Sequence, residues 1–185
     1  MKSSSTVSRT ESKTGEEIDL NDIRQMIHAD HGIVSELFFQ FTQTDDKKIK
    51  GEIVKKILKE LYVHLTAEEG IVYPAIRKEA DDVEDLMDEA DTEHHVVKLL
   101  MTELSEMKPS DDHFDSKVKV LCELVTHHVK EEEKEMFHKI EESDIDVDAL
   151  GKKFAARKTT LLAEAMPKLS LPFKTNSRLV APKKK

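Results

Sequence analysis

The sequence of 185 residues contains no tryptophan, one cysteine, two tyrosines, five glycines and five prolines. So little glycine and proline leaves few turns, which disfavours a sheet-rich fold. A composition in which 36% of the residues are charged is instead typical of long helices. The single cysteine, Cys122, excludes an internal disulfide and a thiolate metal site. These absences predict an all-α protein.

Signals for membranes and for nucleic acids are also missing. No apolar run approaches the roughly 20 residues that a membrane span needs, and residues 1–17 hold no apolar signal core. The net charge is −9 and the basic residues are spread among acidic ones, whereas phosphate recognition needs a clustered basic surface. We therefore expect a cytoplasmic protein with no membrane or nucleic-acid partner, and the sequence does not indicate its oligomeric state.

Apolar residues recur every three or four positions, which predicts helices over about 19–42, 46–78, 82–107, 112–141 and, for a short last helix, 147–166. Gly70 and Pro74 are expected to bend the second helix, and the low helix propensity of Gly151 weakens the prediction of the fifth. Short connections favour antiparallel neighbours. The expected fold is an up-down-up-down four-helix bundle with a short additional C-terminal helix over 18–166, between flexible tails at 1–17 and 167–185.

Polar residues interrupt the apolar stripe of each long helix. They are one histidine on the first and third helices and a His-x-x-x-Glu pair on the second and fourth: His31, His64, Glu68, His94, His128 and Glu132. Residues four apart lie on one helical face, so each pair points the same way. Burying such groups without a partner costs several kcal/mol. A cation between the helices removes that cost, which makes these six residues candidate metal ligands.

The two halves of the chain repeat this pattern. The first histidines, at 31 and 94, are offset by 63 residues, and the His-x-x-x-Glu pairs that begin at 64 and 128 are offset by 64. Each pair is followed by an aromatic residue, Tyr73 in the first half and Phe137 in the second. Two similar helical hairpins predict a bundle with pseudo-twofold symmetry.

Imidazole and carboxylate ligands suit iron, manganese or zinc, whereas calcium and magnesium prefer oxygen alone. Four imidazoles and two bridging glutamates give each of two ions two nitrogens and two oxygens. An additional oxo or hydroxo bridge leaves one open position on each ion, where dioxygen, peroxide or nitric oxide could bind.

The sequence resembles the hemerythrin-like, or HHE cation-binding, family, in particular its bacterial stand-alone members. The resemblance covers about 19–166 and rests on Ala29-Asp30-His31, on 64–74 with its Glu-Glu and Tyr-Pro elements, on Glu93-His94 and on the run 127–137. It implies an antiparallel four-helix bundle with two non-haem iron ions, oxo- or hydroxo-bridged. Oxygen-carrying members have a fifth histidine where this chain has Lys98, so the resemblance disfavours reversible oxygen transport.

Several neighbouring residues compete for these positions. His94 is preferred to His95 because it continues the apolar stripe, while His127 with Glu131 has the same spacing as the pair at 128 and 132, and only the match of Phe137 to Tyr73 selects the latter. His28 is expected at the surface, bordering the site, where it could be an extra ligand or support one. Glu69 and Glu133 are expected on solvated faces, with Glu69 as an alternative carboxylate if the bridge shifts, and His113 and His138 are expected to be exposed.

Two functions follow from this pattern. The first is a di-iron protein that binds or reacts with dioxygen, peroxide or nitric oxide, in which no separate catalytic acid or base is identified. The second is a module that senses or stores iron or oxygen without turnover. A zinc-holding or metal-free helical scaffold is the third possibility.

Overall fold

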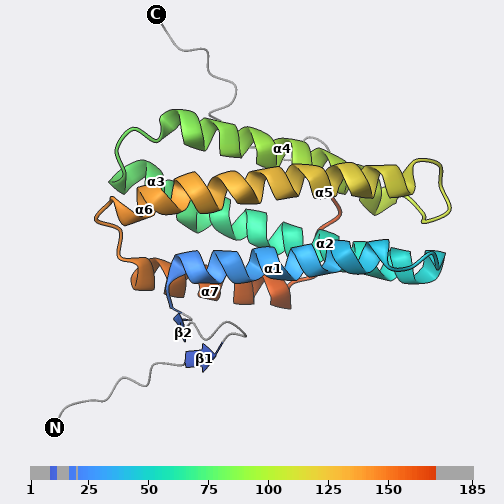
Figure 1. Cartoon of the computed structure of the whole chain (residues 1–185), viewed down its shortest axis with the longest axis horizontal. Coiled ribbons are helices and arrows are strands. Elements are labelled where there is room, and N and C mark those ends of the chain that lie inside the picture. Colours follow the sequence, from blue (N-terminus) through green and yellow to red (C-terminus); the bar gives the residue numbers. More distant parts are fainter. Residues whose placement is uncertain (1–8, 12–16, 20, 170–185) are drawn as a thin grey trace, which may run out of the picture.

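The computed structural model describes residues 9–11, 17–19 and 21–169, and within them the chain is a helical bundle (Figure 1). Its elements are β1 Arg9–Glu11, β2 Glu17–Asp19, α1 Ile23–Thr42, α2 Lys47–Ala67, η1 Glu68–Val72, α3 Tyr73–Glu79, α4 Glu84–Glu106, α5 Phe114–Glu131, η2 Glu132–Met136, α6 Phe137–Glu141 and α7 Val147–Ala163. Strands β1 and β2 form an antiparallel pair that the sequence did not predict.

Four antiparallel helical rods make up the bundle. They are α1, the continuous run α2–η1–α3, α4, and the continuous run α5–η2–α6. Helix α7 packs outside them against α1, α2 and η1. The predicted fold class is therefore confirmed. Within the described residues no helix combines the length and apolarity of a membrane span. The predicted tails lie mostly outside the described residues.

Helix boundaries follow the capping side chains. Asp46 accepts hydrogen bonds from the Lys48 and Ile49 amides at the start of α2. Asp22 accepts one from Arg24, so α1 begins at residue 23 and not near 19 as predicted. Helix α5 begins at Phe114, two residues later than predicted, because His113 is in a left-handed conformation with φ of 67°.

Gly151 lies within α7, although its low helix propensity weakened the prediction of a helix there. The structure explains its presence by close packing, because a Cβ atom at this position would lie 1.9 Å from the Asn21 carbonyl oxygen. Phe154, one turn later, is fully buried beneath the bundle. Glycine thus costs helix propensity but allows α7 to contact the segment that leads into α1.

Two π-helical turns, η1 and η2, interrupt the second and fourth rods at matching positions. The Tyr73 amide donates to the Glu68 carbonyl and the Phe137 amide to the Glu132 carbonyl, five residues back in both cases. Each turn therefore begins at a predicted glutamate ligand. The first turn lies where the sequence predicted a bend, near Gly70 and Pro74, while the second was not predicted because no glycine or proline marks it.

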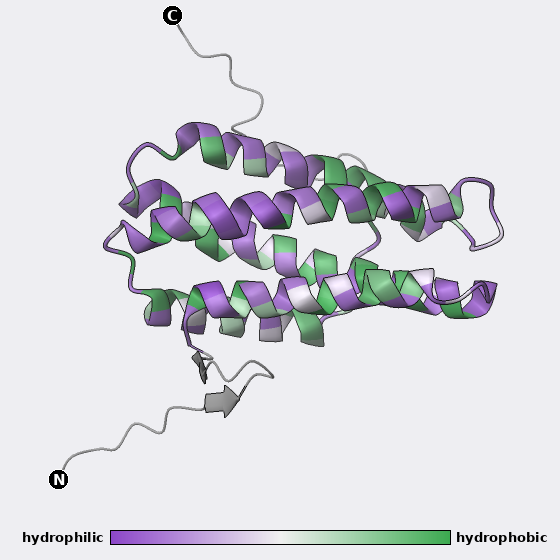
Figure 2. Cartoon of the chain, in the orientation of Figure 1, coloured by the Kyte–Doolittle hydropathy of each residue, from purple (hydrophilic) through white to green (hydrophobic). Residues whose placement is uncertain are grey.

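The interior consists of two apolar clusters with a polar layer between them. One cluster includes Phe38, Leu61 and Leu121, and the other includes Ile27, Met87 and Phe154. All six candidate ligands are buried and lie between these clusters. Figure 2 shows polar and apolar residues alternating along each helix, as expected of amphipathic helices. Buried charge is thus concentrated at one level of the bundle.

Candidate metal centre

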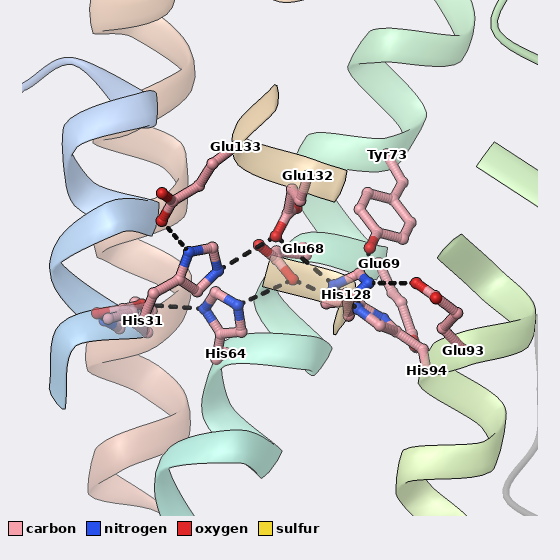
Figure 3. Close-up of polar contacts among 12 residues, drawn as sticks. His31, His64, Glu68, Glu69, Tyr73, Glu93, His94, His128, Glu132 and Glu133 are labelled. Atoms are coloured by element: carbon pink, nitrogen blue, oxygen red, sulfur yellow. Dashed lines mark hydrogen bonds and ion pairs between the residues drawn. The ribbon is translucent and has the colours of Figure 1, made fainter. Parts of the chain in front are cut away.

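The structure brings the six candidate ligands together from all four rods (Figure 3). His31 lies on α1, His64 near the end of α2, His94 on α4 and His128 near the end of α5. Glu68 and Glu132 are the first residues of η1 and η2. None of the six side chains is more than 6% exposed.

The two glutamates each lie between histidines of different rods. The Oε2 atom of Glu68 is 3.2 Å from His64 Nε2 and 3.6 Å from His94 Nε2. The Oε2 atom of Glu132 is 3.2 Å from His31 Nε2 and 3.6 Å from His128 Nε2. All four imidazoles therefore direct Nε2 towards the same pair of carboxylates, as Figure 3 shows.

The atoms that face this centre have unmet bonding capacity. Within the described residues, the buried side-chain atoms without a hydrogen-bond partner include all four carboxylate oxygens of Glu68 and Glu132 and the Nε2 atoms of His31 and His64. Buried polar groups are almost always satisfied, so this concentration of unsatisfied atoms needs a ligand. A cation with nitrogen and oxygen ligands satisfies all of them at once.

A second layer of carboxylates contacts the outer nitrogens of the imidazoles. The Nδ1 atoms of the four histidines lie 2.7–3.3 Å from carboxylate oxygens, in the pairs His31–Glu133, His64–Asp30, His94–Glu69 and His128–Glu93. An ionised carboxylate only accepts, so each Nδ1–H donates and each Nε2 presents a lone pair to the centre. This is the tautomer that a metal-binding histidine needs.

Glu69 and Glu133 were expected on solvated faces, but the structure half-buries both of them at the site. Each of them contacts a histidine of the other hairpin. Asp30 and Glu93 each precede a candidate ligand in the sequence, yet each contacts the second histidine of its own hairpin. The only sequence signal for these roles was the repetition of the acids at matching positions in both halves.

The structure also shows how the competing residues lie. His95 is half-buried, whereas His94 points into the centre. His127 is exposed and faces Glu131, while His128 points inward. His28 is mostly exposed and contacts Glu133, so it borders the site as expected, and His113 and His138 are exposed.

Comparison with known proteins identifies the family. Residues 22–140 match the hemerythrin HHE cation-binding domain. The chain belongs to this family. A crystal structure of a hemerythrin HHE cation-binding-domain protein from Mycobacterium kansasii superposes with a TM-score of 0.66 at 21% identity, covering 76% of this chain and 86% of that one. That likeness shows the shared fold.

A curated relative is named a DNA nickase, from Nostoc sp. strain PCC 7120. It is 32% identical over 121 residues, which are 64% of this chain. The match spans 33% of the length of that relative. The shared part is thus one third of a longer protein.

Two imidazole nitrogens face each other inside this HHE domain. His94 Nε2 and His128 Nε2 are 3.0 Å apart, and their Nδ1 hydrogens are directed to carboxylates. With the hydrogen on both Nδ1 atoms, the two Nε2 atoms cannot hydrogen-bond to each other, and the Tyr73 phenol can donate only to His94, so His128 Nε2 is left facing an acceptor. The contact is a second local feature that a bound cation resolves.

Electrostatics reinforce that conclusion. Burial, together with the neighbouring Glu132 carboxylate, raises the pKa of Glu68 well above its ordinary value. Burial and nearby His128 and Lys98 hold the pKa of His94 well below its ordinary value, so this imidazole is neutral. Without a cation, ionising both buried carboxylates costs free energy, because their charges repel each other. A cation bound between them would favour the ionised form of both.

Tyr73 also lies at the site, although in the sequence it stood out only as the aromatic residue that follows a His-x-x-x-Glu pair. Its phenol lies 2.9 Å from His94 Nε2 and is fully buried. Burial and the charges of Glu132 and Glu68 raise the pKa of Tyr73 well above its ordinary value, so the phenol stays protonated and donates to the imidazole. The π turn at η1 places Tyr73 on the same face as Glu68.

Proposed function

We propose that this HHE domain is a non-haem di-iron protein that binds or reacts with dioxygen, peroxide or nitric oxide. The observation that carries the proposal is the convergence of unsatisfied donor atoms on one buried centre. Two overlapping groups support two ions, because His31 and His64 converge with Glu68 and Glu132, and His94 and His128 also converge with Glu68. Donor atoms in each group lie within 4.8 Å of one another.

In this proposal His31 and His64 hold one ion and His94 and His128 hold the other. Glu68 and Glu132 lie between the two pairs of histidines and would each be shared by both ions. The four imidazoles and two carboxylates fit iron, and Cys122, the one cysteine of the chain, lies outside both groups. Bound iron would supply one-electron redox chemistry and an open position for a small ligand.

A small cavity beside the centre supports a small, weakly polar ligand. It has a volume of about 10 Å³, which is roughly the space of one water molecule. Three of its lining residues are candidate ligands, and every other one is a valine or leucine: His31, His64, His128, Val34, Leu61, Leu65, Val97, Val125 and Val129. Such walls favour dioxygen or nitric oxide over a charged substrate and exclude bulk water.

The side chains around the centre have distinct tasks in this proposal. Four carboxylates hold the imidazoles in one tautomer and orientation, which raises their basicity as ligands. In the metal-free protein Tyr73 donates to His94 Nε2, 2.9 Å away, and an ion bound at this nitrogen would replace that hydrogen bond. Lys98 contacts Glu69 and Lys158 contacts Asp30, so two of the outer carboxylates have a cationic neighbour that offsets their charge.

Metal analysis and an optical spectrum after aerobic purification test the proposal. We expect two irons per chain and the near-ultraviolet absorption of a bridged ferric pair, both lost in His64→Ala and Glu132→Ala. His138→Ala is the matched control, because His138 is exposed and outside both ligand groups. Absence of iron, or iron content unchanged by His64→Ala and Glu132→Ala, would contradict the proposal.

Sensing or storage of iron or oxygen is the second candidate. The two buried, unsatisfied carboxylates favour it, because a fold that needs a cation to offset them responds to metal availability. Rapid consumption of peroxide by the iron-loaded protein supports turnover. Metal-dependent helicity without any consumption supports sensing.

The relative named a DNA nickase raises the question whether this domain binds DNA. We propose that this domain does not itself bind DNA, because the whole chain has a net charge of −9 and the nickase match spans one third of that protein. Incubation of the metal-loaded protein with supercoiled plasmid tests this point. Conversion to the nicked circle, sensitive to His64→Ala, would overturn it.

A further inference from the structure

The segment from His127 to Glu132 carries two overlapping His-x-x-x-Glu pairs, and the buried centre uses only one of them. The other pair, His127 and Glu131, faces outward on α5. His127 Nε2 lies 3.3 Å from Glu131 Oε1, and the imidazole is 59% exposed. The outer pair therefore has the spacing of a metal-binding pair and access to solvent.

A third donor approaches this pair from α4. The Oε1 atom of Glu93 lies 3.6 Å from His127 Nε2, and its Oε2 atom lies 2.8 Å from His128 Nδ1. Donor atoms of Glu93, His127 and Glu131 all lie within 4.8 Å of one another. One imidazole and two carboxylates from two helices form a ligand set for a divalent iron, manganese or zinc ion. Glu93 joins this set directly to a ligand of the buried centre.

A narrow cavity of about 10 Å³ lies between the outer group and the buried centre. Its polar lining residues are Glu89, Glu93, Glu131 and the buried His128 and Glu132, and the rest of its wall is apolar: Leu86, Ala90 and Met136. Glu132 is 2% exposed and neither of its carboxylate oxygens has a hydrogen-bond partner. The residues that line the cavity include no lysine or arginine, so nothing in its walls repels a cation.

The matching positions of the first hairpin contain no such group. In the repeat, Val63 corresponds to His127 and Ala67 to Glu131, and both are fully buried. Asp30 corresponds to Glu93, and it contacts Lys158 of α7. A lysine thus already occupies the position where a cation would approach the first hairpin, so the outer group is not a by-product of the repeat.

We propose that Glu93, His127 and Glu131 bind a divalent cation at the surface, and that this surface site is where ions pass to the buried centre. The loading role rests on the proposed di-metal centre, whereas the surface site does not. An ion held by His127 and Glu131 shares the Glu93 carboxylate with His128. It then needs to move only along the acid-lined cavity to reach Glu132.

Cobalt(II) is a suitable probe because it is divalent, stable in air at neutral pH and coloured when bound. Equilibrium dialysis of the full chain should show one weaker ion in addition to those of the buried centre. That ion should be lost in His127→Ala and in Glu131→Gln. The matched control is His138→Ala, because His138 and Glu142 form an exposed pair of the same spacing, 3.3 Å apart, that belongs to no group of three donors among the described residues.

Stopped-flow absorption of cobalt tests the loading role. In His127→Ala the buried centre should fill at least about tenfold more slowly, because an ion drawn to the acidic surface loses the imidazole that holds it there, and capture of ions at such a cleft raises association rates by 10 to 1,000-fold. Its final occupancy should be unchanged, since His127 does not face the centre. His138→Ala should load at the wild-type rate.

Three results would overturn the proposal. If His127→Ala binds as many ions as the wild type, the surface site does not exist. If it loses the weak ion but loads at the wild-type rate, the surface site is not the route. If His138→Ala loses the same ion, the binding is non-specific. Failure of the buried centre is distinguishable, because the wild type would then still bind one ion that depends on His127.

Discussion

The two helical hairpins supply the same candidate ligands in the same order but differ in what covers them. Helix α7 covers the outside of the first hairpin, α1 with α2, and its Lys158 contacts the outer carboxylate Asp30. The second hairpin, α4 with α5, has half-buried Glu93 at the matching position, beside exposed His127. The interior of the site is thus nearly symmetric and its exterior is not. The repeat sets the geometry of the candidate ligands, whereas α7, packed outside one hairpin, sets from which side solvent and ions reach them.

Substitution of matched ligands should produce the largest effect and tests the symmetry of the interior. His64→Ala and His128→Ala should each lower iron affinity by more than about 100-fold, because loss of an outer-layer partner alone costs 10–100-fold. Anaerobic equilibrium dialysis with iron(II) measures both. Because Glu68 and Glu132 contact histidines of both groups, the two losses should be similar. A loss in only one variant would show that the hairpins bind metal independently.

Substitution of the matched outer carboxylates Asp30 and Glu93 should produce the second-largest effect. Asp30→Asn and Glu93→Gln should each lower iron affinity by about 10–100-fold, because each holds the Nδ1 proton of a histidine. Asp30→Asn should also lower the free energy of unfolding of the metal-free protein by about 1–3 kcal/mol, since it removes the partner of Lys158. Urea unfolding measures the second effect.

The double variant Asp30→Asn with Lys158→Met separates the effect of Asp30 on stability from its effect on iron affinity. It should recover stability without recovering affinity. Equal loss of stability in Asp30→Asn and Glu93→Gln would show that α7 does not distinguish the hairpins.

Displacement of α7 removes the cover of the first hairpin. Gly151→Ala should lower the free energy of unfolding by about 1–3 kcal/mol, because the added Cβ would lie 1.9 Å from the Asn21 carbonyl oxygen. Helix propensity alone predicts the opposite sign, a gain of about 1 kcal/mol. Thermal or urea unfolding decides between them. A stabilised variant would mean that α7 does not pack this closely.

Tyr73→Phe should have the smallest effect, and it makes the first hairpin match Phe137 of the second. Loss of the hydrogen bond to His94 should lower the free energy of unfolding of the metal-free protein by about 1 kcal/mol. The number of bound ions should not change, since Tyr73 belongs to neither ligand group. Urea unfolding and metal analysis of the same preparation measure both. A lost ion would make Tyr73 part of the ligand set.

The local parts of the site were predictable from sequence because a helix has a known period. His64 with Glu68 and His128 with Glu132 stand four residues apart, and polar residues on an apolar stripe indicated burial. The outer carboxylates were not predictable in the same way. Glu133 contacts His31, about a hundred residues away, and a sequence pattern cannot say which acid meets which imidazole across the bundle.

By itself, the sequence determined the helices, the repeat, the six candidate ligands and the chemical class of the site, since each depends on residue type and spacing along one helix. The tertiary structure alone decided which carboxylate orients each histidine, that π turns start at both Glu68 and Glu132, and that α7 covers one hairpin. It also brought Glu93 from α4 to the outer pair on α5. These features depend on how helices distant in sequence pack together, and that packing is set by the whole core at once.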